Sequence, residues 1–153
     1  MTERRIRRRP GENRERLQEA GLIEFGLFGF HGTSTGRIAA RASVPQPHVY
    51  ANFRTKQELF LACVSRAVVS IVELEPDPRG VQAIPIGAVR VVYQAYATAQ
   101  DPALASDLSP LLRELEQHVE PAALGNLLVR AAGALRSEAG EHSSERVATQ
   151  LEL

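Results

Sequence analysis

The chain has 153 residues, of which 44% are hydrophobic and 24% charged, a composition typical of a folded globular protein rather than a disordered one. No apolar run reaches the ~18 residues that a membrane helix requires, and no apolar segment follows the basic N-terminus as in a secretory signal. Cys63 is the single cysteine and the four histidines are scattered, so neither a disulfide nor a zinc site is expected. The sequence predicts a cytoplasmic protein without a metal, a cofactor or a membrane partner.

The net charge of zero conceals two halves of opposite sign. Residues 1–66 hold 12 Lys and Arg against 6 Asp and Glu, whereas residues 67–153 hold 6 against 12. The front half is therefore basic, which favours binding to a polyanion, although a solvated basic tail would have the same composition. The charge is concentrated in an N-terminal arm that contains Arg4, Arg5, Arg7, Arg8 and Arg9.

Apolar spacing predicts three helices in the front half of the chain. The first covers about 13–28 and stops at Gly29. Hydroxyl residues at 33–35 are good N-caps for a short second helix, which precedes a tight turn at 43–45. A third short helix follows and reaches Phe53.

The rear half is also predicted to be helical. A capping box at 55–58 opens a long amphipathic helix, and a linker at 76–80 separates it from a fifth helix over about 84–99. Three more helices are predicted from Ser-Pro and Glu-Pro start signals and from apolar spacing: 109–119, 121–139 and 144–153. No segment shows strand alternation, so the predicted fold class is all-α.

Two short helices joined by a tight turn, behind a supporting helix and a basic arm, form a helix-turn-helix layout. The second helix of such a pair enters the DNA major groove, which is about 12 Å wide, and the first lies across the backbone. Here the third helix would present polar tips to DNA while Val49 and Phe53 face inward. The polar tips are Gln46, His48, Tyr50 and Asn52.

A set of positions in one ungapped register supports this interpretation: Phe25, Gly29, Phe30, Thr33, Ile38, Ala39, Ala42, Val44, Tyr50, Phe53, Lys56 and Leu59. Through these positions residues 14–66 resemble the DNA-binding domain of TetR-type transcriptional regulators, and Val49-Tyr50-x-x-Phe53-x-x-Lys56 is the most specific part. Beyond residue 75 only the helical layout is similar. The resemblance implies a three-helix DNA-binding domain with its arm at 1–54. A long fourth helix would join it to a short helical regulatory domain at 55–153.

The resemblance also implies roles for individual residues. Base edges would be contacted by Gln46, Pro47 and His48. Phosphates and the DNA backbone would be contacted by Tyr50, Asn52, Lys56, Thr33, Thr35 and Arg37, with the arm neutralising further phosphates or entering a minor groove. Tyr50 fits equally well as a core aromatic with a solvated hydroxyl.

The turn between the second and third helices departs from the family pattern, because Ser43 stands where the family usually has glycine. A left-handed backbone at that position would cost on the order of 1–3 kcal/mol. Pro47 also restrains Gln46, so the regular part of the third helix is expected to begin only at Pro47 and to be about one turn long.

The resemblance implies a transcriptional repressor that acts as a homodimer. The repressor would bind a near-palindromic operator, and a small apolar or amphipathic inducer would release it. Candidate residues for the ligand pocket are Arg90, Tyr93, Tyr96, Glu114 and His118, although each also fits a helix surface or core edge. The dimer helices are expected to be shortened. The alternative is a helical ligand-binding or scaffold protein, derived from such a regulator, that no longer binds operator DNA. An enzyme is not expected, because no nucleophile grouping, phosphate loop or carboxylate pair is evident.

Overall fold

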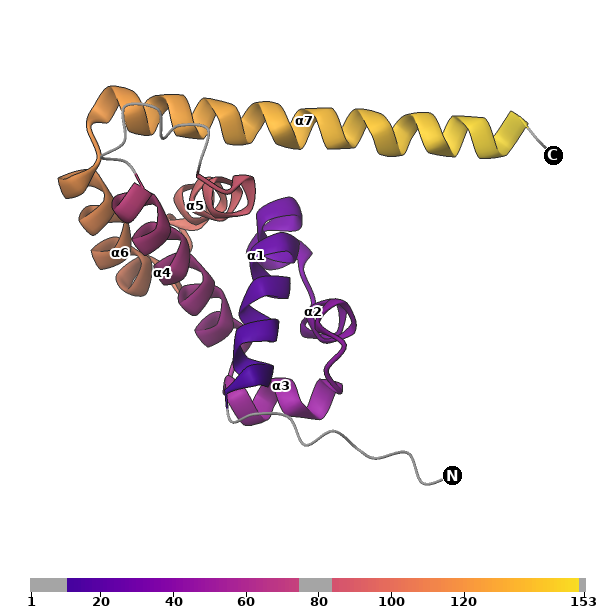
Figure 1. Ribbon diagram of the computed structural model, residues 1–153, viewed down its shortest axis with the longest axis horizontal. Helices are drawn as coiled ribbons and strands as arrows, with labels where there is room; N and C mark the ends of the chain where they lie inside the picture. The colour runs from indigo at the N-terminus through magenta and orange to yellow at the C-terminus, as the bar shows by residue number, and fades with distance from the viewer. Residues whose placement is uncertain (1–10, 75–83, 152–153) are drawn as a thin grey trace.

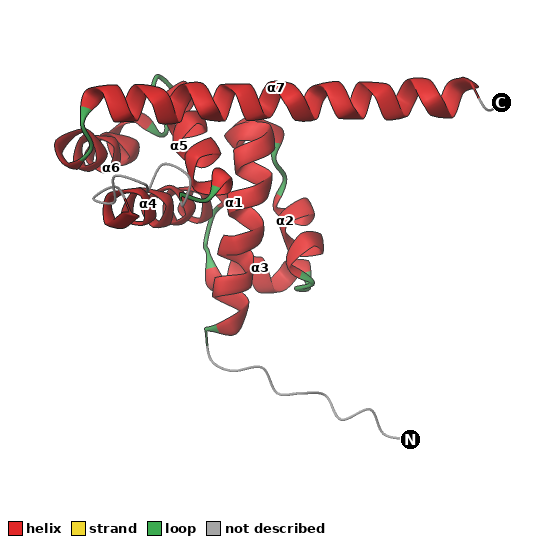
Figure 2. Cartoon of the chain, turned by 45° about the horizontal axis from the view of Figure 1, so that its top comes forward, coloured by secondary structure: helices red, strands yellow, loops and turns green. Residues whose placement is uncertain are grey.

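The computed structural model describes residues 11–74 and 84–151, with side chains up to residue 139, and this part of the chain is helical without strands (Figures 1 and 2). The all-α prediction is confirmed. The arginines of the arm lie outside the described residues. The helices are α1 (Glu12–Gly32), α2 (Thr35–Ala42), α3 (Gln46–Asn52), α4 (Lys56–Leu74), α5 (Ile86–Thr98), α6 (Ala105–His118) and α7 (Pro121–Leu151).

The first helix turns sharply at Gly29, where the sequence predicts that it stops. Gly29 has φ 71° and ψ 178°, and α1 resumes for only a few residues beyond it. This backbone conformation is essentially restricted to glycine. The interruption brings Phe30 back over the core, where its ring lies 5.3 Å from that of Phe60.

The turn after α2 is a Schellman motif in which a serine takes the left-handed position. Ser43 has φ 52° and ψ 42°. Its N–H donates to the Ala40 carbonyl at 3.1 Å, and the N–H of Val44 donates to the Ala39 carbonyl at 3.0 Å. These two bonds satisfy carbonyls at the end of α2, and the burial of Val44 and Ala39 adds the apolar contact that accompanies this motif.

Because glycine adopts this conformation without a Cβ penalty, Ser43→Gly is expected to raise the free energy of unfolding by about 0.5–1 kcal/mol. Urea denaturation of the two chains measures this difference. A loss of stability would show that Ser43 makes a side-chain interaction worth more than the backbone strain.

The third helix is longer than the prolines suggest. It begins at Gln46 and has 7 residues, so the expectation of a single turn that starts at Pro47 is wrong. Pro45 and Pro47 both lie where a helix has no partner for the backbone N–H, and the first bond is made by the His48 N–H to the Pro45 carbonyl at 2.9 Å.

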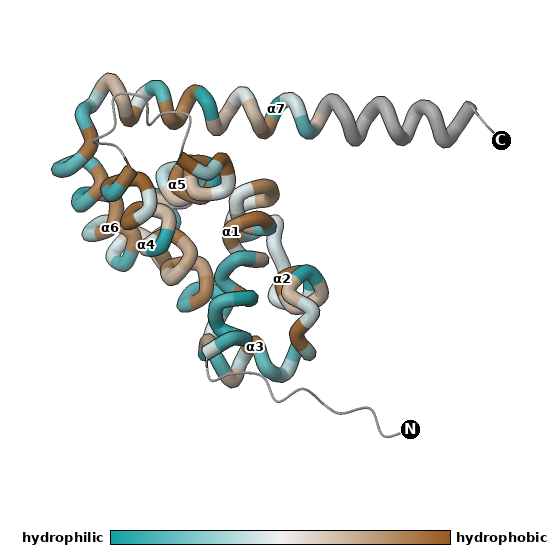
Figure 3. Tube along the Cα trace, in the orientation of Figure 1, coloured by the Kyte–Doolittle hydropathy of each residue, from teal (hydrophilic) through white to brown (hydrophobic). Residues whose placement is uncertain are grey.

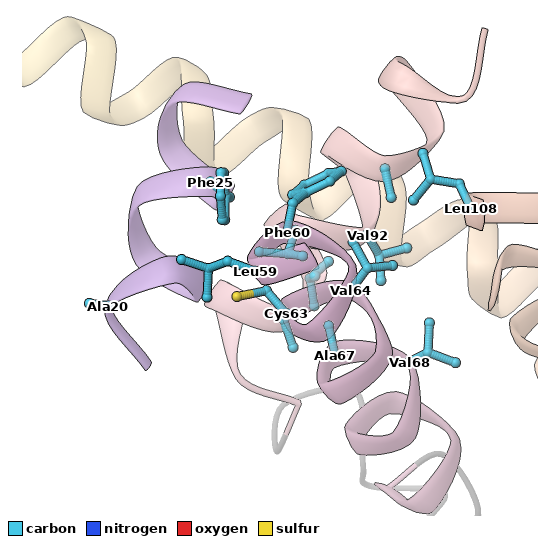
Figure 4. Packing of buried hydrophobic residues seen from close by; sticks show 14 of the residues in the cluster. Ala20, Phe25, Leu59, Phe60, Cys63, Val64, Ala67, Val68, Val92 and Leu108 are labelled. Atoms are coloured by element: carbon cyan, nitrogen blue, oxygen red, sulfur yellow. The ribbon is translucent and has the colours of Figure 1, made fainter. Parts of the chain in front are cut away.

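A single hydrophobic core joins the front helices to the rear ones (Figure 4). The rings of Phe25 in α1 and Phe60 in α4 meet edge to face, with centroids 5.0 Å apart. Cys63 is also buried in this core, and burial raises the pKa of its thiol to about 12. The thiol therefore stays protonated and acts as a packing residue rather than a nucleophile.

Small residues allow α1 to approach two other helices closely. A Cβ on Gly21 would lie 2.7 Å from the Cys63 sulfur in α4, and a Cβ on Gly26 would lie 3.1 Å from the Arg90 Cβ in α5. Apolar residues concentrate where α4, α5 and α6 lie together, whereas α3 and the first half of α1 are hydrophilic (Figure 3). Among the described residues, no helix is long and apolar enough to cross a membrane.

Two boundaries in the rear half differ from the predictions. The sixth helix begins at Ala105 rather than at 109, so Pro110 lies inside it. The reason is Asp101, whose Oδ1 accepts from the Ala103 N–H at 2.9 Å and whose carbonyl accepts from the Ala105 N–H at 2.8 Å. The same Asp-Pro pair that ends α5 thus starts the turn that leads into α6.

The last helix does not stop near residue 139. It continues through Gly140 to Leu151 as one helix of 31 residues, so the separate helix over 144–153 was wrongly predicted. One glycine inside a helix costs only about 1 kcal/mol, which does not terminate it. The first part of α7 lies along the bundle, and its far end extends beyond the other helices (Figure 1).

Candidate nucleic-acid interface

Helix α3 is the helix that the resemblance assigns to the DNA major groove. Its first turn is exposed, and its inward residues are buried in the core. Gln46, Pro47 and His48 are exposed, whereas Val49 and Phe53 are each only 1% exposed. The three residues to which the resemblance gives base contacts are therefore all exposed in the first turn of a short helix. The inward positions of Val49 and Phe53 are as predicted.

Three hydroxyl residues hold the start of α2 in place. The Thr33 hydroxyl donates to the Glu24 carbonyl at 3.0 Å, and Thr33 is buried. Ser34 is the N-cap, because its Oγ accepts from the Arg37 N–H at 3.2 Å. The Thr35 hydroxyl lies 3.1 Å from the Tyr50 hydroxyl, so these two residues link α2 to α3. Tyr50 is 53% exposed, with its ring at the surface rather than in the core.

The Lys56 ammonium lies at the first residue of α4 and contacts the start of α2. Its Nζ donates to the Thr33 carbonyl at 3.0 Å and lies 4.4 Å from the centre of the Phe30 ring. The predicted capping box is formed in part: the Thr55 hydroxyl accepts from the Glu58 N–H at 3.0 Å, whereas the Glu58 carboxylate bonds one residue before the cap. Glu58 reaches back to the Arg54 N–H at 2.8 Å. Lys56 therefore links the start of α4 to the backbone at Thr33, just before α2.

A buried carboxylate joins α1 to α2. Glu24 is 3% exposed, and its oxygens lie 2.7 Å from Arg41 Nε and 3.2 Å from Arg37 Nε. The Arg37 guanidinium also covers the Phe28 ring at 4.1 Å. The two arginines neutralise a charge that would otherwise be costly to bury. Arg37, a predicted DNA contact, is therefore half-exposed and held by an intramolecular ion pair.

The first turn of α1 contacts α3, and the sequence did not predict this contact. Asn13 Nδ2 lies 3.4 Å from His48 Nδ1. The Arg14 guanidinium donates to the Asn52 carbonyl and lies 4.1 Å from the centre of the Phe53 ring. The Asn52 amide donates to the His48 carbonyl at 2.7 Å and so closes the last turn of α3.

Gly36 is a second feature that was missed. A Cβ at this position would lie 3.6–3.8 Å from the side-chain amide of Gln46. These are ordinary van der Waals distances, so Gln46 lies against the first turn of α2 and a Cβ at position 36 would also fit. The glycine is visible in the sequence, but its partner is ten residues away and the contact depends on the angle between the two helices.

The five pocket candidates contact different neighbours. Arg90 on α5 is only 13% exposed and pairs with Glu138 on α7. The Tyr96 hydroxyl donates to Glu116 on α6 at 3.0 Å, and burial together with this carboxylate raises the tyrosine pKa to about 12. Tyr93 packs against the core. Glu114 and His118 are exposed, with His118 Nδ1 2.8 Å from the Glu114 carbonyl.

Polar contacts connect α1 and the start of α4 to α5, to the turn after it and to α6. The Gln94 amide on α5 donates to the Gly26 carbonyl at 3.2 Å. His31 Nε2, at the end of α1, lies 2.9 Å from Asp101 Oδ2. Gln57, at the start of α4, donates to Asp107 Oδ2 at 2.9 Å. Within the described residues, no group of His, Cys, Asp and Glu is arranged to hold a metal ion.

Comparison with known proteins gives the same assignment for the front of the chain. Residues 17–63 match the model of the family described as "Bacterial regulatory proteins, tetR family". A curated relative from Bacillus subtilis (strain 168), YdgC, is described as an uncharacterized HTH-type transcriptional regulator. It is 33% identical over 54 residues, which cover 35% of this chain and 28% of the relative.

Solved structures extend the likeness to the rear helices. A TetR-family chain from Mesorhizobium loti MAFF303099 superposes with a TM-score of 0.58 at 18% identity, covering 82% of this chain and 72% of that one. A TetR-like transcriptional regulator from Rhodococcus sp. RHA1 has a TM-score of 0.47 at 21% identity, covering 85% and 99%. At this identity, the first of the two shows a shared fold. Residues 17–63 are therefore similar to the helix-turn-helix domain that the tetR family model describes, and the chain as a whole shares the fold of the Mesorhizobium loti structure.

Proposed function

We propose that this chain is a cytoplasmic transcriptional repressor that binds a near-palindromic operator as a homodimer and is released by a small apolar or amphipathic ligand. The observation that carries the proposal is the exposed first turn of α3. Gln46, Pro47 and His48 are exposed there, while Val49 and Phe53 are buried in the core and hold the helix in place. A glutamine side chain can pair with adenine in the major groove. Arginines of the arm add sequence-independent attraction to phosphate.

The contacts between the front and rear helices support release by a ligand. A ligand that moves α5 acts on α1 through the Gln94 amide and on the end of α1 through the His31–Asp101 pair. A ligand that moves α6 acts on the start of α4 through Gln57, which donates to Asp107. Two heads of a dimer must lie about 34–36 Å apart to engage successive major grooves. A small rotation of α4 in each protomer therefore changes affinity by altering that separation.

The proposal is tested by selecting duplexes from a random-sequence pool with the full chain. We expect an enriched sequence with two related half-sites and a steep fall of affinity with salt concentration. Sequence-blind binding, or none, would support the alternative of a helical ligand-binding protein that does not recognise an operator.

The dimer is proposed to use the outer face of α7. Val129 is 73% exposed, and it is flanked at helical spacing by small exposed residues, namely Ala122, Gly125 and Ala132. Small side chains allow a second helix to approach closely. A helix that extends beyond its own bundle also offers a long surface to a second copy (Figure 2).

Val129→Asp is expected to convert the dimer to a monomer at micromolar concentration, because a carboxylate would be buried between two helices. Light scattering measures the mass directly. Val69→Asp on α4 is a matched control, since Val69 is also an exposed valine at 45%. A monomeric wild type, or equal effects of both substitutions, would count against this interface.

Lys56→Met removes the ammonium at the start of α4, which lies over the Phe30 ring, and keeps an unbranched side chain. We expect weaker binding to every duplex, by a similar factor, and a salt slope lower by about one unit if the ammonium neutralises one phosphate. Affinity measured at several salt concentrations gives the slope. An unchanged slope would assign Lys56 only to its bond with the Thr33 carbonyl.

A further inference from the structure

The first turn of α1 contacts His48 on α3, one of the residues that we propose to face DNA. Asn13 lies in this turn, and its Nδ2 is 3.4 Å from Nδ1 of His48. The neighbouring Arg14 holds the other end of α3 through the Asn52 carbonyl and the Phe53 ring. The position of the imidazole is therefore defined from α1 as well as from α3.

The partner of Nδ1 determines which nitrogen of His48 carries the proton. An amide NH₂ group donates hydrogen bonds and accepts none, so Nδ1 of the neutral ring must be the acceptor. The single ring hydrogen then lies on Nε2. We propose that Asn13 is a positioning residue that holds His48 in the Nε2–H tautomer, so that position 48 presents a hydrogen-bond donor to DNA. This inference rests on the proposed DNA-binding function.

A fixed donor distinguishes base pairs by their major-groove edges. Guanine presents two acceptors there, N7 and O6, and no donor, whereas cytosine presents an amino donor. Adenine presents one of each. His48 in the Nε2–H tautomer therefore favours guanine over cytosine, while N7 of adenine and O4 of thymine can also accept its hydrogen bond. The other tautomer would present an acceptor to the groove and would favour the amino groups of cytosine and adenine.

Asn13→Asp reverses the hydrogen bond at nearly constant size. A carboxylate only accepts, so Nδ1 must donate to it, and Nε2 of the neutral ring loses its hydrogen. An acidic residue in the first turn also suits the helix dipole, so α1 is expected to form normally. Gln100→Glu makes the same amide-to-carboxylate change at an exposed position just after α5, away from α3 and from the outer face of α7, and serves as the control.

The tautomer can be measured in the free protein by nitrogen-15 NMR of the histidine-labelled full chain. His48→Gln identifies the signal by its loss. At about pH 9, well above the ordinary histidine pKa of about 6.5, we expect Nε2–H in the wild type and in Gln100→Glu, and Nδ1–H in Asn13→Asp. An Nδ1–H wild type, or the same tautomer in the wild type and Asn13→Asp, would overturn the inference.

Base preference is measured on the duplex that the wild type enriches most from a random-sequence pool, with each base pair varied in turn. At one position per half-site the wild type is expected to bind guanine about tenfold more tightly than cytosine. Asn13→Asp should abolish or reverse this ratio, while its added charge weakens all duplexes alike. Equal ratios in the two chains would contradict the inference. If the wild type enriches no sequence, the DNA-binding proposal fails, whereas the NMR spectra still decide whether Asn13 sets the tautomer.

Discussion

Gly29→Ala is expected to lower the free energy of unfolding by about 2–3 kcal/mol. The backbone conformation at Gly29, φ 71° and ψ 178°, costs a residue with a Cβ on the order of 1–3 kcal/mol. The new Cβ would also lie 2.9 Å from Gln94 Oε1, so the Gln94 side chain would move and lose its bond to the Gly26 carbonyl. That hydrogen bond contributes about 1 kcal/mol, and reduced freedom of the unfolded chain offsets part of the total.

Thermal and urea denaturation measure this loss, which corresponds to a fall in Tm of roughly 5–10 °C for a chain of this size. Gly87→Ala is the matched control, because a Cβ on Gly87 meets nothing within 4 Å and the residue lies in the first turn of α5. The control is expected to be neutral or slightly stabilising. Equal stabilities of the two variants would show that a side chain at position 29 does not strain the backbone of α1.

The fold class could be predicted because the signals that determine it are local. Helical spacing, the Thr55 cap and the break at Gly29 depend on neighbouring residues, and the structure has each of them, although α1 resumes for a few residues beyond Gly29. The errors arose where one signal has two meanings. Asp101-Pro102 ends one helix but also starts the turn into the next, and Gly140 lies within a helix instead of ending it.

The candidate site could be predicted only in part, for a related reason. The exposed residues of α3 follow from the position of the helix in the layout, and the inward anchors follow from its spacing. The supports of that helix are contacts between distant parts of the chain, such as Asn13 with His48, which are 35 residues apart. A polar residue in the first turn of α1 is ordinary in the sequence, and only the packing of α1 against α3 gives it a partner.

Glu24→Ala is expected to cost about 2 kcal/mol of stability and most of the sequence preference in DNA binding. Glu24 holds Arg37 and Arg41 at 3.2 and 2.7 Å from a site where it is 3% exposed. Removing one partner of a fully buried ion pair costs about 3–5 kcal/mol. Here both guanidiniums are about half-exposed and regain water, so the cost is smaller. The loss of this link leaves α2 less firmly held against α1, and α3 moves with α2.

Glu19→Ala provides the comparison, since Glu19 is an exposed glutamate of the same helix whose carboxylate lies 3.6 Å from Arg66. Its loss is expected to change stability by less than about 0.5 kcal/mol. Binding to the selected duplex and to random DNA separates the two roles of Glu24. Because Glu24→Ala releases two guanidiniums, its affinity for random DNA should stay equal or rise while its affinity for the selected duplex falls at least tenfold. Parallel losses on both duplexes would instead indicate general unfolding of the head, and an unchanged ratio at full stability would show that α2 needs no carboxylate to orient α3.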